Sequence, residues 1–236
     1  MIYFFQGFKG FLIQWSEHQN GSPWLVAAAF LTVMIAGYLL GSVNTAIILS
    51  KNLYGADVRD YGSGNAGMTN MFRAFGKKAG FLTLAGDSLK ALLAVVTGFL
   101  IMGDMGSYVG GFFCLLGHSF PVFFHFKGGK GVVVSAITIL FINPVVFLLL
   151  ILIFGLMFLA TQIVSASSIT AAFFYPALVY GIGKATGTFK GVEVIFALFI
   201  GMFVIAMHRE NIHRMINHTE KKIEFGKNKK NKKDKK

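Results

Sequence analysis

The sequence is short of charge and of cysteine, and each shortage excludes a class of protein. Charged residues make up 14% of its 236 residues, whereas a soluble domain carries about 25%. The single cysteine, Cys114, stands inside an apolar run, so no disulfide can form within the chain, and we expect a small buried side chain there. In place of charge, the sequence has 55% apolar residues and a mean hydropathy of +0.64. Long apolar runs of this kind indicate a membrane domain.

Acidic residues are scarce, and many of the basic residues that outnumber them gather at the carboxyl end. Residues 221–236 hold nine lysines against two acidic residues, a large part of the net charge of +12. A lysine run can bind nucleic acid, but this one lacks the interleaved aromatic residues on which successive bases stack. We therefore predict a polybasic cytoplasmic tail that binds anionic lipid and fixes the topology. Residues 1–23 lack the basic start and the cleavage site of a signal peptide, so we predict an interfacial extension there.

Six apolar stretches run along the chain, and one of them is too long for a single crossing. A span needs about 20 residues to cross a hydrocarbon core of about 30 Å. As one helix the longest stretch would extend about 43 Å, and it contains Asn143-Pro144, where the residue before proline is driven out of the helical region. The stretches are 24–50, 80–102, 106–124, 132–160, 163–183 and 191–207.

The basic loops decide whether the longest stretch crosses once or reverses. With six crossings, the loops 51–79 and 125–131 would face away from the basic tail, against the tendency of Lys and Arg to stay in the cytoplasm. A reversal at Asn143-Pro144 makes every basic loop cytoplasmic. We therefore predict an all-α integral membrane protein of about seven transmembrane segments over residues 24–220, with the N-terminus outside and the C-terminus in the cytoplasm. The piece before the break would be a half-helix of about 16 Å, which is tolerated where it packs on protein or lines a cavity.

Three polar segments separate the apolar stretches, and the first is rich in glycine. It reads GSGNAGMTN from Gly62 to Asn70, and Arg73 follows. Glycine lets backbone N–H groups approach an anion closely, and arginine pairs with phosphate through two parallel hydrogen bonds. A simple turn would need one glycine rather than three. The residues predicted to form a phosphate-binding loop are Gly62, Ser63, Gly64, Asn65, Thr69, Asn70 and Arg73.

The second polar segment is KGGKG at 127–131, directly before an apolar stretch. A glycine loop with a lysine at a helix N-terminus is a ready anion site. It is not a Walker motif, because Lys130 is followed by glycine rather than by Ser or Thr. The alternative is a basic cytoplasmic loop whose glycines only make turns. The residues predicted to bind phosphate are Gly128, Gly129, Lys130 and Gly131.

The third polar segment, HRENIHR, follows the last apolar stretch. At 3.6 residues per turn, His208 and Asn211 lie on one helical face. Arg209 and Arg214 are also explained as interfacial residues whose charged ends reach water. The histidines lack the i,i+4 spacing of metal ligands on a helix, so no metal site is predicted.

Further polar residues fall inside the predicted segments. Segments 2, 4 and 6 begin on the cytoplasmic side in this topology, so the positive ends of their dipoles face the three polar segments. Segment 6 opens with SASS at 165–168, and each serine is either an N-cap or a polar site residue. Asp87 and Lys90 lie one helical turn apart and can pair. Such a pair within a span is either functional or a structural ion pair.

Together these residues resemble the PlsY family of bacterial acyl-phosphate:glycerol-3-phosphate acyltransferases. The resemblance runs from about Leu25 to Ile223 and includes Gly41-Ser42, GSGNAGMTN with Arg73, the Asp87/Lys90 pair, the run from Gly117 to Val132, and HRENIHR. There are departures: Val133-Val134 replace a common Ala-Thr, and His218 replaces a frequent glycine. Glu220, close to His218, is kept.

The resemblance implies transfer of a fatty acyl group from acyl-phosphate to the 1-hydroxyl of sn-glycerol 3-phosphate, giving lysophosphatidic acid and phosphate without a cofactor. An acyl-phosphate is already activated, so such an enzyme mainly aligns two anions and neutralises their charge. The match also implies a cytoplasm-facing site in the bacterial cell membrane and an upstream acyl-phosphate synthase as a partner. Matched residues imply phosphate binding by Ser168 and catalytic roles for Ser63, Arg73, Lys130, His208 and Asn211.

Other classes of membrane protein fit part of the pattern. No histidine is followed five positions later by aspartate, so the HxxxxD signature of other acyltransferases is absent. His208 remains a candidate base, although we prefer an orienting or phosphate-binding role. An anion or phosphate-ester transporter also uses broken helices, but no half of the sequence repeats the other. A CDP-alcohol phosphotransferase would need an Asp-rich metal signature, which is absent.

Overall fold

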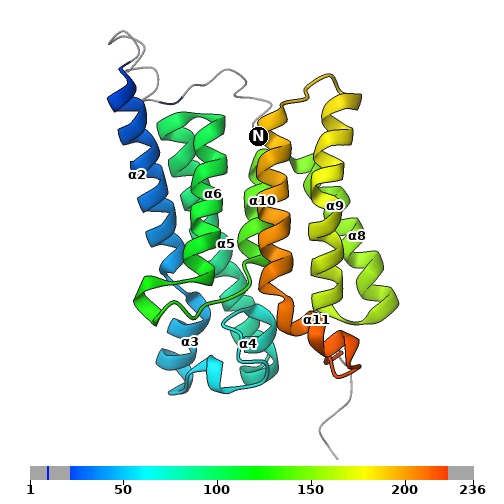
Figure 1. Cartoon of the computed structure of the whole chain (residues 1–236). Helices are drawn as coiled ribbons and strands as arrows, with labels where there is room; N and C mark the ends of the chain where they lie inside the picture. The colour runs from blue at the N-terminus through cyan, green and yellow to red at the C-terminus, as the bar shows by residue number, and fades with distance from the viewer. Residues whose placement is uncertain (1–9, 11–21, 223–236) are drawn as a thin grey trace, which may run out of the picture.

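The computed structural model describes residue 10 and residues 22–222, and this part of the chain is helical without strands (Figure 1). The predicted extension 1–23 and the tail 221–236 lie almost wholly outside the described residues. The longer helices are α2 (Pro23–Ser42), α5 (Lys77–Met102), α6 (Asp104–Ser119), α8 (Pro144–Thr161), α9 (Val164–Ala185) and α10 (Gly191–Met207). The shorter helices are α3 (Thr45–Tyr54), α4 (Met68–Phe75), α7 (Val132–Ile142) and α11 (Arg209–Ile216).

Five helical stretches are long and apolar enough to cross a membrane, and the bent pair of α10 and α11 makes a sixth. The axis turns by 56° between these two helices. The all-α architecture expected from the sequence is therefore confirmed for the described residues, while the number of crossings and the orientation of the termini stay predictions. One expected stretch differs. The run 24–50 is interrupted after Ser42, because the Asn44 side chain accepts a hydrogen bond from Ile47 N (3.1 Å) and starts α3 there.

The predicted break at Asn143-Pro144 is confirmed. Helix α7 ends at Ile142, and the side chain of Asn143 accepts a hydrogen bond from Val146 N (3.1 Å), which caps α8. Proline has no N–H to donate, so it is tolerated in the first turn, where Pro144 lies. The result is a helix of 11 residues beside one of 18, about 16 Å against about 27 Å.

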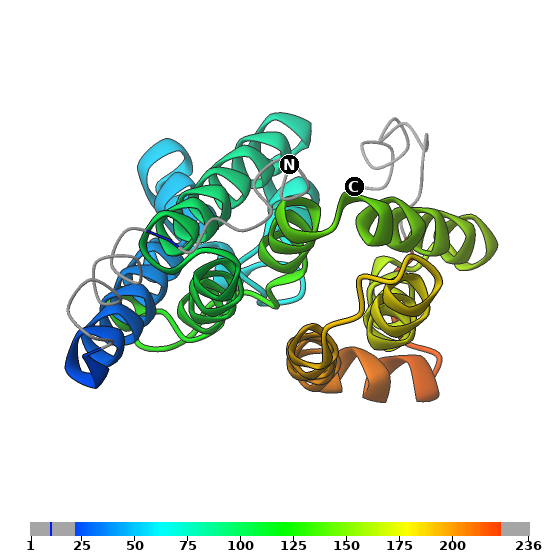
Figure 2. The same cartoon turned by 90° about the horizontal axis from the view of Figure 1, so that it is seen from above.

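The helices form two groups that are joined through α7 and α8 (Figure 2). Helices α2, α5, α6 and α7 make up one group, and α8, α9 and α10 make up the other. Small residues allow close contact within the first group: Gly98 and Gly106 face each other so closely that a Cβ on either would lie 1.9 Å from the carbonyl oxygen of the other. Membrane helices commonly associate through such residues, because burial of apolar surface does not drive their packing in lipid.

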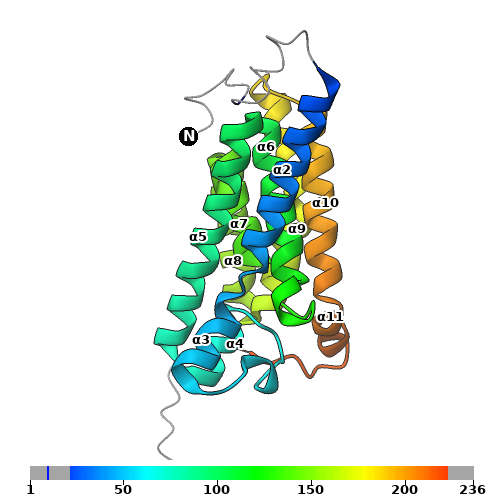
Figure 3. The ribbon, with the colours of Figure 1, turned by 90° about the vertical axis from the view of Figure 1, so that its left-hand side faces the viewer.

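The polar segments gather at one end of the bundle. Helices α3, α4 and α11 lie together there, below the long helices in the views of Figures 1 and 3. The loop between α6 and α7, which holds KGGKG, reaches the same end. The expectation that the three polar segments share one face is therefore confirmed.

Candidate functional site

A pocket of about 210 Å³ lies where the three polar segments meet. Ten of the fourteen site residues predicted from the sequence line it, and four glycines do not: Gly62, Gly64, Gly128 and Gly129. The predicted residues in the lining are Ser63, Asn65, Thr69, Asn70, Arg73, Lys130, Gly131, Ser168, His208 and Asn211. The lining that the prediction did not assign to the site includes Gly67, Asp87, His118, Val132, Val133, Phe154, Ser165 and Glu220.

The first loop is held in shape by one buried amide, Asn70. Its Nδ2 donates to the carbonyl oxygens of Val58 (3.0 Å) and Tyr61 (2.9 Å), and its Oδ1 accepts from Ser63 N (3.0 Å). Asn70 is 1% exposed, so water cannot satisfy its polar atoms and the loss of any of these bonds would leave a buried group unpaired. The contact fixes the backbone of Ser63 at the rim of the pocket. Asn70 therefore contributes to the site mainly by shaping this loop.

Gly62 and Gly64 have structural roles in this loop, and neither lines the pocket. Gly62 has a φ of 61°, and a Cβ there would lie 2.2 Å from Asn70 Oδ1, so glycine is needed for close approach of that side chain. The amide of Gly64 donates to Tyr61 O (3.0 Å). The N–H groups of Met68 and Thr69 lie in the first turn of α4, where a helix supplies no acceptor. Both residues line the pocket, so these amides are the ones available to an anion.

The KGGKG loop repeats this pattern. The amides of Gly128 and Gly129 donate to the carbonyl oxygens of Ser119 and His118, both at 3.1 Å, so they are not available to phosphate. A Cβ on Gly129 would lie 2.2 Å from His118 Nε2. These two glycines therefore pack the loop onto the end of α6 and present no free amide to the pocket, which disfavours the predicted phosphate binding by Gly128 and Gly129. Gly131, with a φ of 76°, precedes α7 and does line the pocket.

Helix N-termini reach the pocket, although not all those expected. The first residues of α7 and α9 line it, as does the first turn of α4. Helix α5 was expected to point its N-terminus at the site, but it begins at Lys77, outside the lining. The short helix α4, which precedes α5, takes that place.

Lys130 connects the KGGKG loop to the third polar segment. Its Nζ contacts Asn211 Oδ1. Burial, and next the charge of Arg214, lower the Lys130 pKa to about 8. A lysine in this setting is still largely cationic at neutral pH and gains from an anion that replaces lost hydration.

Glu220 organises the third segment, and the sequence argument gave it no role. Its carboxylate accepts hydrogen bonds from Ser165 Oγ (2.7 Å), Arg214 Nε (2.7 Å) and Asn211 Nδ2, and its side chain is 7% exposed. Burial alone would raise its pKa, but the hydrogen bonds from Arg214, Ser165 and Asn211 outweigh burial and lower it. The one signal in the sequence was that this residue matches the family pattern.

Arg73 extends from α4 toward the residues that follow Glu220. Its Nη2 donates to the carbonyl oxygen of Lys221 (3.1 Å), and burial lowers its pKa. Arg73 and Lys130 therefore place two cationic groups in one pocket, and the carboxylates of Asp87 and Glu220 also line it.

His208 is held in one orientation by the end of α10. Its Nδ1 lies 2.7 Å from Val204 O, and a carbonyl only accepts, so Nδ1 carries the proton. In the neutral ring Nε2 is then an acceptor. His208 is 3% exposed and lines the pocket. This tautomer suits an orienting role toward a hydroxyl better than phosphate binding.

The serines at the start of α9 do not cap it. The helix begins at Val164, and Ser167 and Ser168 instead donate to the carbonyl oxygens of Ile163 (3.0 Å) and Val164 (2.9 Å). The capping alternative is therefore wrong for these serines. Ser168 lines the pocket, as does Ser165.

The pair within α5 is an ion pair at the buried end of the pocket. Lys90 Nζ lies 3.0 Å from Asp87 Oδ1 and 2.9 Å from His118 Nδ1. It also donates to the carbonyl oxygens of Gly41 (3.1 Å) and Val43 (2.8 Å), where α2 ends and its last carbonyls have no helical partner. The structural reading of the pair is therefore supported. Among residues 22–222, no group of three or more metal-ligating side chains occurs.

Known proteins resemble this chain over most of its length. A sequence model of the family described as glycerol-3-phosphate acyltransferase matches residues 31–218. The glycerol-3-phosphate acyltransferase of Bacillus subtilis (strain 168) is 38% identical over 193 residues, which cover 82% of this chain and 97% of the relative. That of Streptococcus thermophilus (strain CNRZ 1066) is 39% identical over 206 residues, covering 84% and 95%.

Solved structures match over a similar length. One is the crystal structure of PlsY (YgiH), an integral membrane glycerol 3-phosphate acyltransferase, in its glycerol 3-phosphate form; it gives a TM-score of 0.74 at 36% identity and covers 83% of this chain and 96% of that chain. The lysophosphatidic acid form of PlsY gives a TM-score of 0.70 at 35% identity, with coverage of 83% and 95%.

Proposed function

Because this chain belongs to the glycerol-3-phosphate acyltransferase family, we propose that it transfers a fatty acyl group from acyl-phosphate to the 1-hydroxyl of sn-glycerol 3-phosphate, forming lysophosphatidic acid. The observation that carries the proposal is the meeting of Arg73, Lys130 and His208 in one pocket. Two substrates with phosphate groups need two neutralising cations. A hydroxyl nucleophile needs an acceptor that orients its proton.

The roles follow from where each group lies. Arg73 and Lys130 neutralise the two phosphate groups, aided by the first-turn amides of α4 and α7. Ser63 donates a hydroxyl hydrogen bond to the same groups, and Ser168 does so when its hydroxyl turns away from Val164 O. His208 accepts a hydrogen bond at Nε2 from the 1-hydroxyl and so orients it. Asn211 holds the Lys130 ammonium in place.

In the reaction, the 1-hydroxyl oxygen attacks the acyl carbonyl carbon. The bond from that carbon to the phosphate oxygen breaks, and the hydroxyl proton, held toward His208 Nε2 before the attack, passes to the departing phosphate. Alignment of the two substrates supplies most of the rate, since the donor is already an activated anhydride. The acyl chain lies against the apolar wall of the pocket, which Val132, Val133 and Phe154 provide.

The proposed setting is the bacterial cell membrane, with the pocket on the cytoplasmic face. Multi-pass membrane architecture is common to this chain and PlsY. Seven crossings with the C-terminus inside would keep the basic loops and the polybasic tail in the cytoplasm. That tail would bind anionic lipid and could be reached by an acyl-phosphate synthase that supplies the donor.

The test is transfer by purified, lipid-reconstituted protein given radiolabelled glycerol 3-phosphate and either palmitoyl-phosphate or palmitoyl-CoA. Lysophosphatidic acid formed only from palmitoyl-phosphate is the expected result. Product from the CoA ester would overturn the donor assignment. Uptake of the label into proteoliposomes without product would favour the transporter.

A further inference from the structure

The turn that leads into the KGGKG loop has a conformation that its residues disfavour. His125 and Phe126 have φ angles of 57° and 56°, in the left-handed region that L-residues rarely adopt outside glycine. Two such residues in succession persist only where surrounding contacts hold them. Phe126 is 57% exposed, so packing of its own side chain is not the main restraint.

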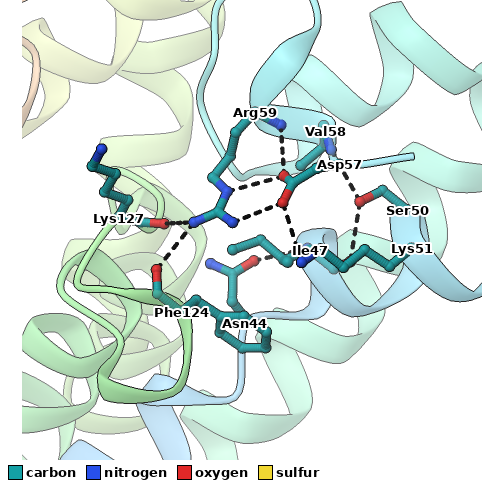
Figure 4. Close-up of polar contacts among 9 residues, drawn as sticks. All are labelled: Asn44, Ile47, Ser50, Lys51, Asp57, Val58, Arg59, Phe124 and Lys127. Atoms are coloured by element: carbon teal, nitrogen blue, oxygen red, sulfur yellow. Dashed lines mark hydrogen bonds and ion pairs between the residues drawn. The ribbon is translucent and has the colours of Figure 1, made fainter. Parts of the chain in front are cut away.

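Arg59 supplies the restraint from outside the turn. Its Nη1 donates to the carbonyl oxygens of Phe124 (3.0 Å) and Lys127 (3.2 Å), which flank the two left-handed residues (Figure 4). Within the turn, Phe126 N donates to Pro121 O (3.0 Å). The guanidinium thus bridges the entry and the exit of the turn, three residues before Lys130.

Arg59 is itself fixed by a carboxylate. Asp57 Oδ1 accepts from Arg59 Nε (2.9 Å) and Arg59 N (3.0 Å), and Asp57 Oδ2 accepts from Nη2 (2.7 Å). The hydrogen bond from Arg59 lowers the Asp57 pKa to about 2, so the pair stays charged. Lys51 Nζ lies 3.4 Å from Asp57 on its exposed side. Nε and Nη2 hold Asp57, and Nη1 is directed at the turn (Figure 4).

The segment that carries Arg59 is the one that Asn70 shapes. Asn70 binds the carbonyl oxygens of Val58 and Tyr61, the residues on either side of Arg59 and Asp60. Movement of Arg59 would therefore be transmitted to the GSGN loop as well as to the KGGKG loop. Arg59 does not line the pocket, so it has no contact with substrate there.

We propose that Arg59 is a positioning residue that clamps the strained 124–127 turn to the GSGN segment and so sets the place of Lys130 relative to Ser63 and Arg73. This inference rests on the proposed function, because its readout is binding of the phosphate-bearing acceptor. Loss of the clamp lets the turn relax, and Lys130 then meets glycerol 3-phosphate in the wrong place. The effect falls on ground-state binding first.

The experiment compares Arg59→Ala with Lys51→Ala in the reconstituted transfer assay with palmitoyl-phosphate. Lys51 also pairs with Asp57 but, among the described residues, makes no hydrogen bond to the turn, which makes it the matched control. Arg59→Ala is expected to raise the KM for glycerol 3-phosphate at least tenfold with kcat within about threefold, whereas Lys51→Ala changes neither by more than twofold. Arg59→Lys is expected to behave like Arg59→Ala, since an ammonium cannot hold Asp57 and both carbonyls at once.

A rescue separates clamping from general stability. Adding Phe126→Gly to Arg59→Ala gives the turn a residue that adopts a left-handed φ freely, and it should recover at least threefold of the lost KM. If Arg59→Ala does not fold, Arg59→Lys with the same rescue decides. An unchanged KM in the Arg59 variants beside an active wild type would overturn the inference, as would a loss confined to kcat or a rescue that fails. An inactive wild type would instead refute the proposed function.

Discussion

The GSGN loop and the C-terminal segment both reach the pocket, but different chemistry holds each in place. A neutral amide, Asn70, fixes the first through three hydrogen bonds to backbone groups. A carboxylate, Glu220, fixes the second through side chains of α9 and α11. Bonds between neutral groups do not respond to pH or salt, whereas the charged network does. The amide network that holds the GSGN loop is therefore insensitive to pH and salt, whereas the carboxylate network that holds the C-terminal segment responds to both.

The largest expected effect comes from Lys130, which lies in the KGGKG loop and contacts Asn211 of the C-terminal segment. Lys130→Met removes the cation that neutralises a phosphate and leaves Asn211 Oδ1 without its donor. We expect kcat/KM to fall by about 10³ or more, since a lost charge-assisted contact to the reacting groups costs about 4 kcal/mol. Steady-state kinetics in the reconstituted assay measure it. Lys127→Ala is the control, because Lys127 contributes a backbone carbonyl to Arg59 and keeps it. Near-normal turnover by Lys130→Met would sink its assignment.

Isosteric substitutions sharpen the comparison itself. Asn70→Asp turns two donors into acceptors that face the carbonyl oxygens of Val58 and Tyr61, with a cost of about 1–3 kcal/mol for each buried group left unpaired. Glu220→Gln keeps the shape and loses one charge-assisted bond, about 1.5–3 kcal/mol. We expect losses in kcat/KM of about 10²–10³ for the first and about tenfold for the second.

Matched variants control for the substitution type. Asn52→Asp lies on an exposed face of α3, and Glu210→Gln removes a carboxylate that is 66% exposed and 3.8 Å from Arg214. Both should stay within twofold of wild type. If Glu220→Gln proves more damaging than Asn70→Asp, the C-terminal segment is the more rigid of the two segments and the comparison is reversed.

The pH dependence of kcat/KM tests Lys130, which contacts the charged network of Glu220 through Asn211. Burial lowers the Lys130 pKa to about 8, so Lys130 loses its proton, and its attraction for phosphate, as pH rises through that value. We expect kcat/KM for glycerol 3-phosphate to fall up to tenfold per pH unit above about 8. In the bound state the anion raises the pKa again, so the decline in kcat should start at higher pH. An alkaline limb that persists unchanged in an active Lys130→Arg variant would assign it to another group.

The smallest effect is expected at His218, which leads into Glu220. Its φ of 54° lies in the left-handed region, where glycine avoids a cost of about 1–2 kcal/mol. Glycine also loses more freedom on folding, about 0.5–1 kcal/mol. His218→Gly should therefore leave activity within twofold and raise the free energy of unfolding by at most about 1.5 kcal/mol. His218→Val is the counterpart, and its unfolding midpoint should drop. An unchanged midpoint would show that position 218 carries no backbone strain.

The sequence predicted the elements well, because its strongest signals are local. Apolar length and the Asn143-Pro144 pair define α7 and α8, and the basic loops place all three motifs on one side. The misassigned residues are those whose role depends on a distant partner. At Gly62 and Gly129 the predicted reason for glycine was an amide that approaches an anion, whereas the structure shows a close approach of the Asn70 and His118 side chains. Glu220 and His118 join the site only through tertiary contacts.

The half-length of α7 has a consequence for how the product is made. From the turn at Asn143, α7 runs 11 residues toward the pocket and α8 runs 18, so the mouth of α7 is set back by about 10 Å. Glycerol 3-phosphate can then bind in this recess in contact with water. The acyl carbonyl carbon that its hydroxyl attacks reaches the recess from the hydrocarbon side. Glycerol 3-phosphate therefore stays in water and the acyl chain stays in lipid. The lysophosphatidic acid that forms is already oriented like the neighbouring lipids of the leaflet.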